Sequence, residues 1–382
     1  MKKLLICFLI ILLSPFNVFA LELEADVTKN AKSAVAMDVS TGQILYNKNA
    51  NEISSVASLT KMMGLILIFE SLENKVISLD EVITVSKNAK EMGGSQIWLE
   101  EGEKISINDL IKGITLASAN DAMVAMAERI SGTEEAFVKK MNNKVKEYGL
   151  KNTYFKNCTG LDEVGHYSSA YDMAIIAKHL LEYEDVLNFT SVYEDYIRKG
   201  TDNESWIVNT NKLVRFYDGV DGLKTGSTDE AGKCMAVTIN KNNFRVIVVT
   251  LGYGDTNTRN SETSDLLDYI FNQYEGKILF KKNQVIQRVN VNKGKKDYVE
   301  LFSKDDIILV NKKSDKNKKY DYRVVLNDMN LPIKKGDVLG RIEILDGKNI
   351  VLKKDLVTDK DIDKLNILEL YLRNLRYSIA NS

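Results

Sequence analysis

The chain has little histidine and no excess of charge of either sign. Its 382 residues include two histidines, His166 and His179, so a histidine-based triad or a multi-histidine metal site is poorly supplied. Lys and Arg number 52 and Asp and Glu number 53, which gives a formal net charge of -1. This balance provides no basic field for nucleic acid, and we expect no nucleic-acid partner.

Cysteine is also scarce, with one residue near the N-terminus and two in the body of the chain. Cys7 is not followed by the small-residue pattern of a lipid-attached cysteine. Cys158 and Cys234 could form a disulfide in an exported protein. Two isolated cysteines on apolar segments are more often buried free thiols, and we expect that here.

A long apolar run occurs at the N-terminus. Lys2 and Lys3 precede residues 4–13, which are almost wholly apolar but too few to span a bilayer comfortably. Val18-Phe19-Ala20 then offers small residues at the positions that a signal peptidase reads. We expect residues 1–20 to be a cleaved signal peptide and the protein to work outside the cytoplasm. An uncleaved N-terminal anchor is the alternative.

Apolar periodicity predicts a mixed part followed by a β-rich part. Strands are predicted at residues 34–38, 43–46, 234–239 and 244–251, and helices at 58–72, 107–116, 121–130 and 258–274. Strands at both ends with helices between them predict one sheet covered by helices, an α+β architecture.

The pattern changes near Gly276. Short β-like runs separated by lysine-rich turns follow, at residues 285–291, 307–310, 322–326 and 338–345. Helical periodicity returns after them. We therefore expect a larger domain over residues 21–276, a small all-β domain over 277–360 and a terminal helix over 361–382.

The first chemical motif is Ser58-Leu59-Thr60-Lys61. Residues three apart on a helix lie on one face, so this spacing places an amine beside a hydroxyl without a histidine. A serine hydroxyl is a poor nucleophile until a base takes its proton. A lysine serves as that base only when burial and neighbouring positive charge lower its pKa. The motif alone is weak evidence, because serine and lysine are common.

The second motif is Ser118-Ala119-Asn120, in the predicted break between two helices. A serine here can relay a proton to a leaving amine. An asparagine amide can hold a substrate peptide group through its donor and its acceptor. The alternative is that Asn120 only caps the following helix.

The third motif is Lys224-Thr225-Gly226-Ser227-Thr228. Gly226 on a strand lets a substrate backbone lie close to the strand edge. Lys224 supplies positive charge, and Thr225 supplies a hydroxyl for a terminal carboxylate. The alternative is a lysine in a surface loop.

Together, in this order and at this approximate spacing, the motifs resemble the set shared by class A β-lactamases and penicillin-binding proteins. Further short sequences resemble the low-molecular-mass D-Ala-D-Ala carboxypeptidases, peptidase family S11, over nearly the whole mature chain. These include Gly94-Ser95, Asn120-Asp121-Ala122, Thr159-Gly160-Leu161-Asp162, Gly165-His166-Tyr167-Ser168, Asn209-Thr210-Asn211 and Ala231-Gly232-Lys233-Cys234. Val56 and Cys158 stand where the family usually has proline, and Ala119 where it usually has glycine.

The resemblance implies a penicillin-binding/β-lactamase-like catalytic domain that acts on peptidoglycan pentapeptides ending in D-Ala-D-Ala. It implies covalent inhibition by β-lactams and no metal or cofactor. Ser58 would attack the penultimate D-alanine carbonyl, Lys61 would accept its proton, and Ser118 would help to protonate the departing D-alanine. Backbone N–H groups of Ser58 and Ser227 would form the oxyanion hole.

The resemblance also implies which residues bind the substrate. Asn120 would hold the acyl-side peptide, while Lys224 and Thr225, beside Gly226, would bind the terminal carboxylate. Arg259 could reinforce carboxylate binding, since guanidinium matches that geometry, or it could be a solvated arginine at a helix start. We expect His166 to make a structural hydrogen bond and His179 to be partly buried.

Other functions on this scaffold are a serine β-lactamase, a DD-endopeptidase or transpeptidase, and a non-catalytic wall-binding protein. Residues 184–188 match the E-x-x-L-N box that carries the deacylating glutamate of β-lactamases. They lie too close to Lys224 and too far from Ser118 for the usual placement, so we interpret the match as coincidence. The intact motifs argue against a non-catalytic protein.

The terminal segment predicts an amphipathic helix. Its apolar residues fall on one stripe, made of Leu365, Leu368, Tyr371, Leu372, Leu375 and Ile379. The segment is too charged and too short to span a bilayer. We expect a membrane-surface helix that holds the exported protein at the outer face of the cytoplasmic membrane. The alternative is that the stripe packs on the β domain or on another copy.

Overall fold

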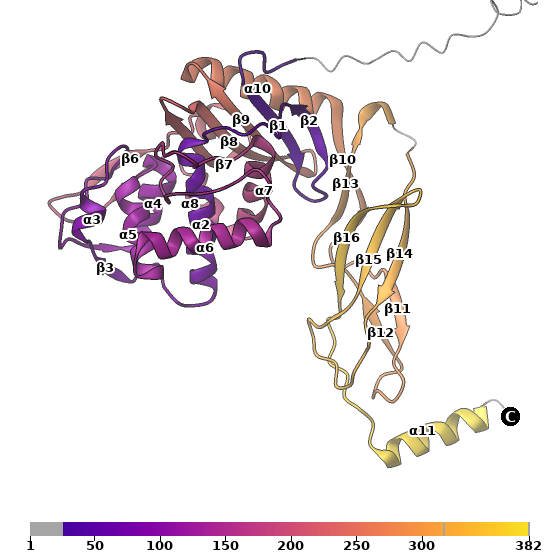
Figure 1. Cartoon of the computed structure of the whole chain (residues 1–382). Coiled ribbons are helices and arrows are strands. Elements are labelled where there is room, and N and C mark those ends of the chain that lie inside the picture. Colours follow the sequence, from indigo (N-terminus) through magenta and orange to yellow (C-terminus); the bar gives the residue numbers. More distant parts are fainter. Residues whose placement is uncertain (1–25, 316–317, 381–382) are drawn as a thin grey trace, which may run out of the picture.

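The structure, a computed structural model, describes residues 26–315 and 318–380 (Figure 1). The expected signal peptide, residues 1–20, and Cys7 therefore lie outside the described residues. A larger part of mixed helices and strands is followed by a slender β-rich part, and the last helix lies at the far end of the latter.

A five-stranded antiparallel sheet forms the centre of the larger part, in the order β2-β1-β9-β8-β7. Its strands are β1 (Ser33–Asp38), β2 (Ile44–Lys48), β7 (Val220–Thr228), β8 (Gly232–Lys241) and β9 (Phe244–Tyr253). Strand β1 pairs with β9, so strands from both ends of this part share one sheet, as the sequence predicts.

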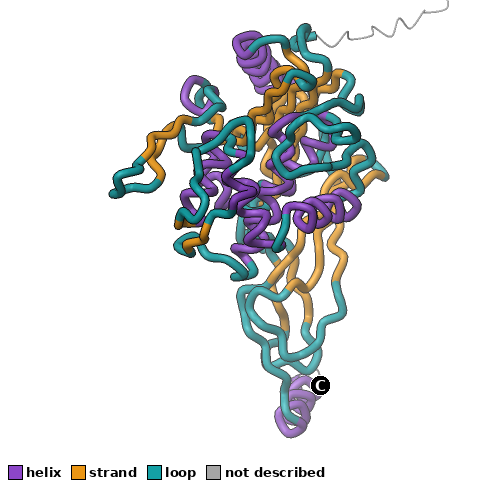
Figure 2. The backbone as a smooth tube through the Cα atoms, turned by 60° about the vertical axis from the view of Figure 1, so that its left-hand side comes forward, coloured by secondary structure: helices purple, strands orange, loops and turns teal. Residues whose placement is uncertain are grey.

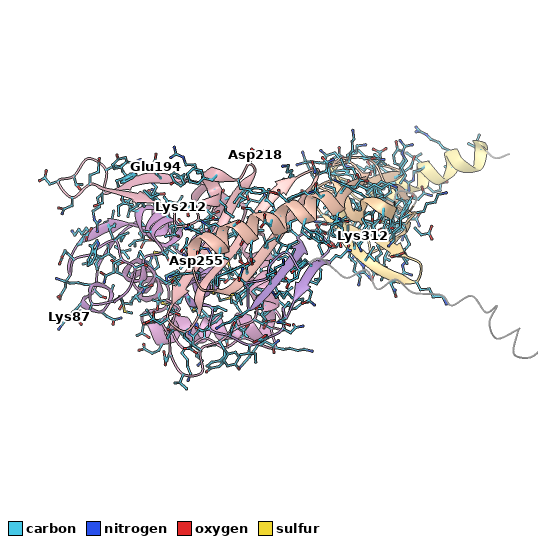
Figure 3. All side chains as sticks on the ribbon, turned by 90° about the horizontal axis from the view of Figure 1, so that it is seen from above. Lys87, Glu194, Lys212, Asp218, Asp255 and Lys312 are labelled. Atoms are coloured by element: carbon cyan, nitrogen blue, oxygen red, sulfur yellow. The ribbon has the colours of Figure 1, made fainter. Side chains whose placement is uncertain are left out.

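Both faces of the sheet are buried. Successive strand residues point to opposite faces, and each face packs against its own apolar cluster. Val35 belongs to the apolar cluster beneath the sheet, which contains residues of helices α2, α5 and α7. Ala36 belongs to the cluster on the other face, which contains residues of α10. Figure 3 shows α10 running along that outer face, from Asp255 toward the β-rich part near Lys312. The sheet is therefore the middle of three layers.

The helices of the larger part lie on both faces of the sheet or pack on the helices that do. They are α2 (Lys61–Glu73), α3 (Lys87–Lys90), α4 (Ile107–Lys112), α5 (Asn120–Ser131), α6 (Glu134–Glu147), α7 (Ala170–Leu180), α8 (Leu187–Thr190), α9 (Leu213–Phe216) and α10 (Thr256–Gln273). Two short hairpins lie among them, β3 (Val82–Thr84) with β4 (Lys104–Ser106) and β5 (Glu194–Ile197) with β6 (Ser205–Val208).

Two predicted helices are interrupted beside chemical motifs. The helix predicted from residue 58 begins as a 3-10 turn, Ala57–Thr60, and becomes α2 only at Lys61. The helix predicted over residues 107–116 is α4 followed by a π-helical turn, Gly113–Ala117. Short 3-10 or π-helical stretches, in which the regular α-helical hydrogen bonding is interrupted, are frequent at functional sites.

The β-rich part begins where α10 ends. It contains β10 (Tyr274–Phe280), β11 (Gln287–Asn290), β12 (Tyr298–Leu301), β13 (Ile307–Lys312), β14 (Asp321–Leu326), β15 (Val338–Asp346) and β16 (Asn349–Val357). Its own core includes Val299, Ile307, Ile342 and Leu356. An all-β unit is what the sequence predicts, although β10, β12 and β16 were not among the predicted strands.

The terminal helix α11 (Ile367–Ala380) begins later than the predicted residue 361 (Figure 2). Its apolar stripe faces solvent: Leu368 is 66% exposed, Tyr371 is 61% exposed and Ile379 is 72% exposed. The alternative that the stripe packs on the chain's own β domain is therefore wrong. Within the described ranges, no helix has both the length and the apolar character needed to cross a membrane.

Candidate active site

Ser58 and Lys61 meet at the junction of the 3-10 turn with α2. Lys61 Nζ lies 2.8 Å from Ser58 Oγ and donates to the carbonyl oxygen of Thr159 at 2.6 Å. Lys61 is fully buried, and burial lowers its pKa to about 7, against opposing effects of Cys158 and Asp121. A lysine with this pKa is substantially neutral near pH 7, so the turn holds a base beside the hydroxyl.

Ser118 and Lys224 form a second serine–lysine pair. Lys224 Nζ donates to Ser118 Oγ at 2.7 Å and to the carbonyl oxygen of Thr225 at 2.9 Å. Lys224 is buried on β7, so the alternative of a surface-loop lysine is wrong. Burial lowers the pKa of Lys224 well below its usual value, and the positive charges of Lys61 and Arg259 lower it further.

The backbone presents Ser118 in an unusual conformation. Its φ is +63°, in the left-handed region that non-glycine residues seldom occupy. Ser118 directly follows the π-helical turn and lies two residues before the start of α5. Such strain persists only where the surrounding structure fixes it, and it concentrates at functional sites.

Ser58 and Ser118 both line one cavity of about 330 Å³. Its lining residues are Ser58, Ser95, Ser118, Val208, Thr210, Lys212, Thr225, Gly226, Ser227, Lys233, Thr256 and Arg259. Hydroxyl and cationic groups dominate, and none of these lining residues is acidic. Such a cavity suits a ligand that carries peptide groups and a negative charge.

Gly226 allows β7 to pass close to the nucleophile. A Cβ atom at residue 226 would lie 2.9 Å from the carbonyl oxygen of Val56 and 3.1 Å from the backbone N of Ser58. The prediction assigned Gly226 to close approach of a substrate. The structure adds that the protein's own backbone approaches there, and Ser58 and Ser227 both line the cavity.

Asn120 is the first residue of α5 and is not among the residues that line the cavity. Ala119 occupies the cap position, so the alternative of Asn120 as a helix cap is wrong. Asn120 Nδ2 donates to the carbonyl oxygen of Gly93 at 2.6 Å, whereas its Oδ1 is buried and has no hydrogen-bond partner among the described residues. A buried acceptor without a donor is costly, so this oxygen is suited to receive a ligand N–H.

Arg259 lies on α10 and reaches the cavity from the outer face of the sheet. It is 3% exposed and donates to the carbonyl oxygen of Cys234 at 3.4 Å. The alternative of a solvated arginine at a helix start is therefore wrong. Carboxylate binding by Arg259 remains a prediction.

Comparison with known proteins agrees with this arrangement. Residues 21–255 match the family model described as D-alanyl-D-alanine carboxypeptidase, Peptidase_S11. The chain belongs to that family. Residues 274–364 match the model of the C-terminal domain of penicillin-binding protein 5. The chain is thus an S11 carboxypeptidase, a hydrolase with a penicillin-binding catalytic domain and a C-terminal all-β domain.

Three relatives illustrate the similarity. D-alanyl-D-alanine carboxypeptidase DacF of Bacillus subtilis (strain 168) is 45% identical over 352 residues, which cover 92% of this chain and 90% of that protein. Penicillin-binding protein 5 of Haemophilus influenzae has a TM-score of 0.68 and 31% identity, covering 88% of this chain and 98% of that one. A peptidoglycan synthesis regulatory factor (PBP3) of Streptococcus pneumoniae has a TM-score of 0.70 and 29% identity, covering 87% and 99%.

The sequence did not predict a role for several residues at the carboxypeptidase site. Thr225 Oγ1 donates to Thr210 Oγ1 at 2.8 Å, and Lys233 Nζ donates to Ser227 Oγ at 2.7 Å. A Cβ atom on Gly160, whose φ is +82°, would overlap the carbonyl oxygen of Ala57. All of these residues lie in short sequences that resemble the family, and that resemblance was the available signal.

His166 has a structural role: it holds the 3-10 turn that carries Ser58. Its Nε2 lies 2.8 Å from Thr60 Oγ1, and its Nδ1 accepts from the backbone N of Lys156 at 3.2 Å. Burial lowers its pKa to about 4, so the ring is neutral and bonded on both sides. The predicted structural role is confirmed, as is the partial burial of His179. Cys158 and Cys234 are buried free thiols, also as predicted.

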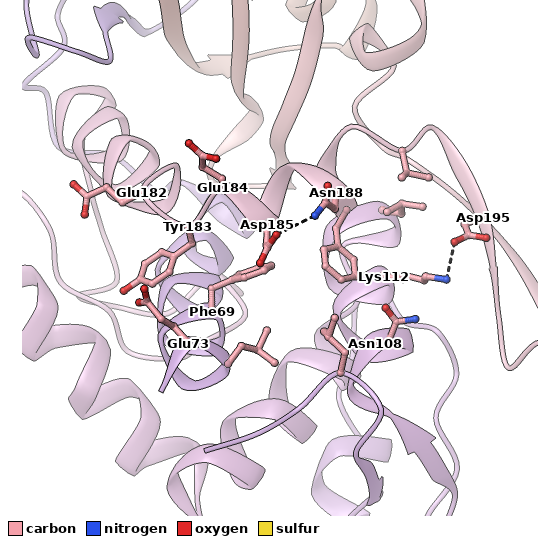
Figure 4. Close-up of a pocket in the computed structure, with 15 residues that line it drawn as sticks. Phe69, Glu73, Asn108, Lys112, Glu182, Tyr183, Glu184, Asp185, Asn188 and Asp195 are labelled. Carbon is pink, nitrogen blue, oxygen red and sulfur yellow. Dashed lines mark hydrogen bonds and ion pairs between the residues drawn. The ribbon is translucent and has the colours of Figure 1, made fainter. Parts of the chain in front are cut away.

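The β-lactamase-like box lies elsewhere in the carboxypeptidase. Glu184 and Asn188 line a different cavity of about 840 Å³, beside α2 and α4, that Figure 4 shows in close-up. It shares no lining residue with the cavity of Ser58. Lys112 pairs there with Asp195 at 2.7 Å. Glu184 is therefore not a lining residue of the cavity where an acyl group on Ser58 would lie.

Proposed function

We propose that this carboxypeptidase removes the terminal D-alanine from peptidoglycan pentapeptides through an acyl-enzyme on Ser58. The observation that carries the proposal is the 2.8 Å contact between Ser58 Oγ and the buried Lys61, whose pKa is about 7. A serine needs such a base to become nucleophilic. The cationic cavity beside it supplies a place for the substrate carboxylate.

Acylation begins with attack on the peptide carbonyl. Lys61 takes the Ser58 proton as Oγ bonds to the carbonyl carbon of the penultimate D-alanine. The amides of Ser58 and Ser227 stabilise the oxyanion that forms, a contribution typically of about 3–4 kcal/mol per donor. The C–N bond then breaks, and the leaving amine of D-alanine receives a proton through Ser118. Water later cleaves the ester and restores the hydroxyl of Ser58.

Recognition depends on the free C-terminus of the peptide. Lys224, Thr225 and Arg259 receive the carboxylate, whose negative charge offsets the burial and the neighbouring positive charges that lower the pKa of Lys224. Asn120 Oδ1 accepts the N–H of the acyl-side peptide and so gains the partner that it lacks. β-Lactams, which carry a comparable carboxylate, acylate Ser58 in the same way.

A substrate comparison tests this recognition. Lys224→Ala lowers kcat/KM for a pentapeptide acid about tenfold or more, since hydrogen bonds to charged groups contribute about 1.5–3 kcal/mol. The C-terminal amide of the same peptide loses much less, because it offers no charge to Lys224. The assay follows D-alanine release from the acid and D-alaninamide release from the amide. Equal losses for acid and amide would assign Lys224 a general structural role instead.

The enzyme also acts outside the cytoplasm in this proposal. Residues 1–20 direct export, and α11 lays its exposed apolar stripe on the outer face of the cytoplasmic membrane. This places the active site where lipid-linked precursors and nascent wall are found. The stripe's exposure and the amphipathic sequence support the anchor.

A further inference from the structure

Both tryptophans of the chain are exposed in the larger part of the molecule. Trp98 is 78% exposed, and Trp206 is 58% exposed. Indole is a large, mostly apolar group, and leaving it in water forgoes the free energy that burial would provide. Two such side chains near one site indicate a surface that a ligand covers.

The segment around Trp98 is held rigidly while its indole faces solvent. Buried Asp121 accepts from the backbone N of Ile97 at 3.1 Å and from that of Leu99 at 3.1 Å. Arg198 donates to the carbonyl oxygens of Ile97 at 3.1 Å and Trp98 at 3.4 Å. Trp98 itself has a φ of +58°. Two charged side chains thus maintain a strained backbone that presents an aromatic ring to water.

Both tryptophans lie close to the active-site cavity along their own segments. Trp206 and Val208 are two residues apart on β6 and therefore share a face, roughly 7 Å from one another. Val208 lines the Ser58 cavity, as does Ser95, three residues before Trp98. Arg198 follows β5 and joins this hairpin to the Trp98 segment. The two exposed rings therefore belong to adjoining segments, each of which contributes a lining residue to the cavity.

We infer that Trp98 and Trp206 bind the saccharide part of the substrate, the sugar rings to which the stem peptide is attached. The inference rests on the proposed function. An indole face stacks on the apolar C–H face of a pyranose ring and leaves the sugar hydroxyls in water. The peptide carboxylate goes to the cations inside the cavity, so the uncharged sugar end of the same molecule extends outward over the aromatic rings. The rings thus favour glycan-linked peptides over sugar-free ones.

Kinetics with paired substrates test the inference. Trp98→Ala and Trp206→Ala each lower kcat/KM for a disaccharide pentapeptide about fivefold, through KM, and leave a sugar-free pentapeptide unchanged. Trp98→Phe and Trp206→Phe retain most of the difference, because phenylalanine keeps an aromatic face. Tyr298→Ala, which removes an aromatic residue 43% exposed in the β-rich part, changes neither substrate. Equal losses on both substrates, or no loss on the disaccharide pentapeptide, would overturn the inference.

Fluorescence separates this inference from the proposed function. If the wild type hydrolyses neither substrate, the proposed function fails, and binding then decides the inference. Emission reports on this surface alone, since the chain has two tryptophans and both lie there. Titration with the disaccharide pentapeptide gives a saturable blue shift that the sugar-free pentapeptide does not give. An unchanged spectrum, or dimerisation or vesicle binding that both alanine variants abolish, would refute saccharide binding.

Discussion

At the scale of single residues, the account depends on the protonation of Lys61. The buried amine has a pKa of about 7 and lies 2.8 Å from Ser58 Oγ. Because its pKa in the folded state is lowered, the neutral form gains population as pH rises through 7. The base that activates Ser58 is therefore lost as pH falls below that value.

Acylation by a β-lactam should follow this titration. We expect the second-order rate constant to rise between about pH 6 and 8 with an apparent pKa near 7, as measured by stopped-flow with a fluorescent penicillin. Lys61→Arg keeps the charge but cannot lose its proton, so acylation falls about 100-fold or more. Lys144→Arg, which changes a half-buried lysine that is ion-paired with Glu70, serves as the control and retains the wild-type profile. A flat profile would mean that Lys61 is not the base.

At the scale of elements, two glycine-containing segments pack against the 3-10 turn that holds Ser58. Gly226 on β7 and Gly160 both lie against backbone atoms of residues 56–58. Neither position has room for a Cβ atom, because backbone atoms of residues 56–58 occupy the space. The nucleophile is thus positioned by backbone packing as much as by its own helix.

Gly160→Ala should displace this turn. The added methyl meets the carbonyl oxygen of Ala57, and φ is +82°. We expect a loss of about 2–4 kcal/mol in unfolding free energy, by denaturant titration, together with slower penicillin acylation. Gly132→Ala is the matched control, since its φ is +81° but no atom lies within 4 Å of the added Cβ. That variant should lose only about 1 kcal/mol and acylate normally. Equal behaviour of the two variants would show that packing against Ala57 is unimportant.

Helix α11 should decide membrane association. We expect the full-length mature protein to bind liposomes and a chain ending at Asn366 to remain soluble and active on pentapeptide. A cut at Thr358 would be unsuitable, because Ile362 is buried in the β core and pairs with Ile333. Flotation of both forms with anionic vesicles gives the answer. Binding by the truncated form, or none by the intact form, would rule out the anchor; self-association of the intact form would instead indicate packing on another copy.

The sequence predicts much of this site because the chemistry lies in short local motifs. Spacing alone places Lys61 beside Ser58, and periodicity predicts the sheet and its covering helices. Contacts between distant segments are different: Lys224 meets Ser118, and Thr225 meets Thr210, only through tertiary packing. The π-helical turn, the burial of Arg259 and the backbone approach at Gly160 also depend on packing, which no local pattern encodes.

At the scale of the whole molecule, the enzyme is an active site separated from a terminal amphipathic helix by an all-β unit. Figure 1 shows the helix at the end of the β-rich part that lies away from the catalytic domain. If α11 lies on the membrane, the β unit sets the height of the Ser58 cavity above it. This arrangement would suit lipid-linked precursors and nascent wall that extend outward from the membrane.

The proposed reaction requires a covalent bond at Ser58. The most direct measurement is intact-protein mass spectrometry after incubation with benzylpenicillin, with D-alanine release from pentapeptide assayed in parallel. We predict one penicilloyl adduct, mapped by peptide digestion to Ser58, in the wild type and in the control Ser55→Ala. Ser58→Ala should keep its fold and lose both the adduct and D-alanine release. A penicilloyl adduct or undiminished D-alanine release in Ser58→Ala would contradict the assignment of the nucleophile.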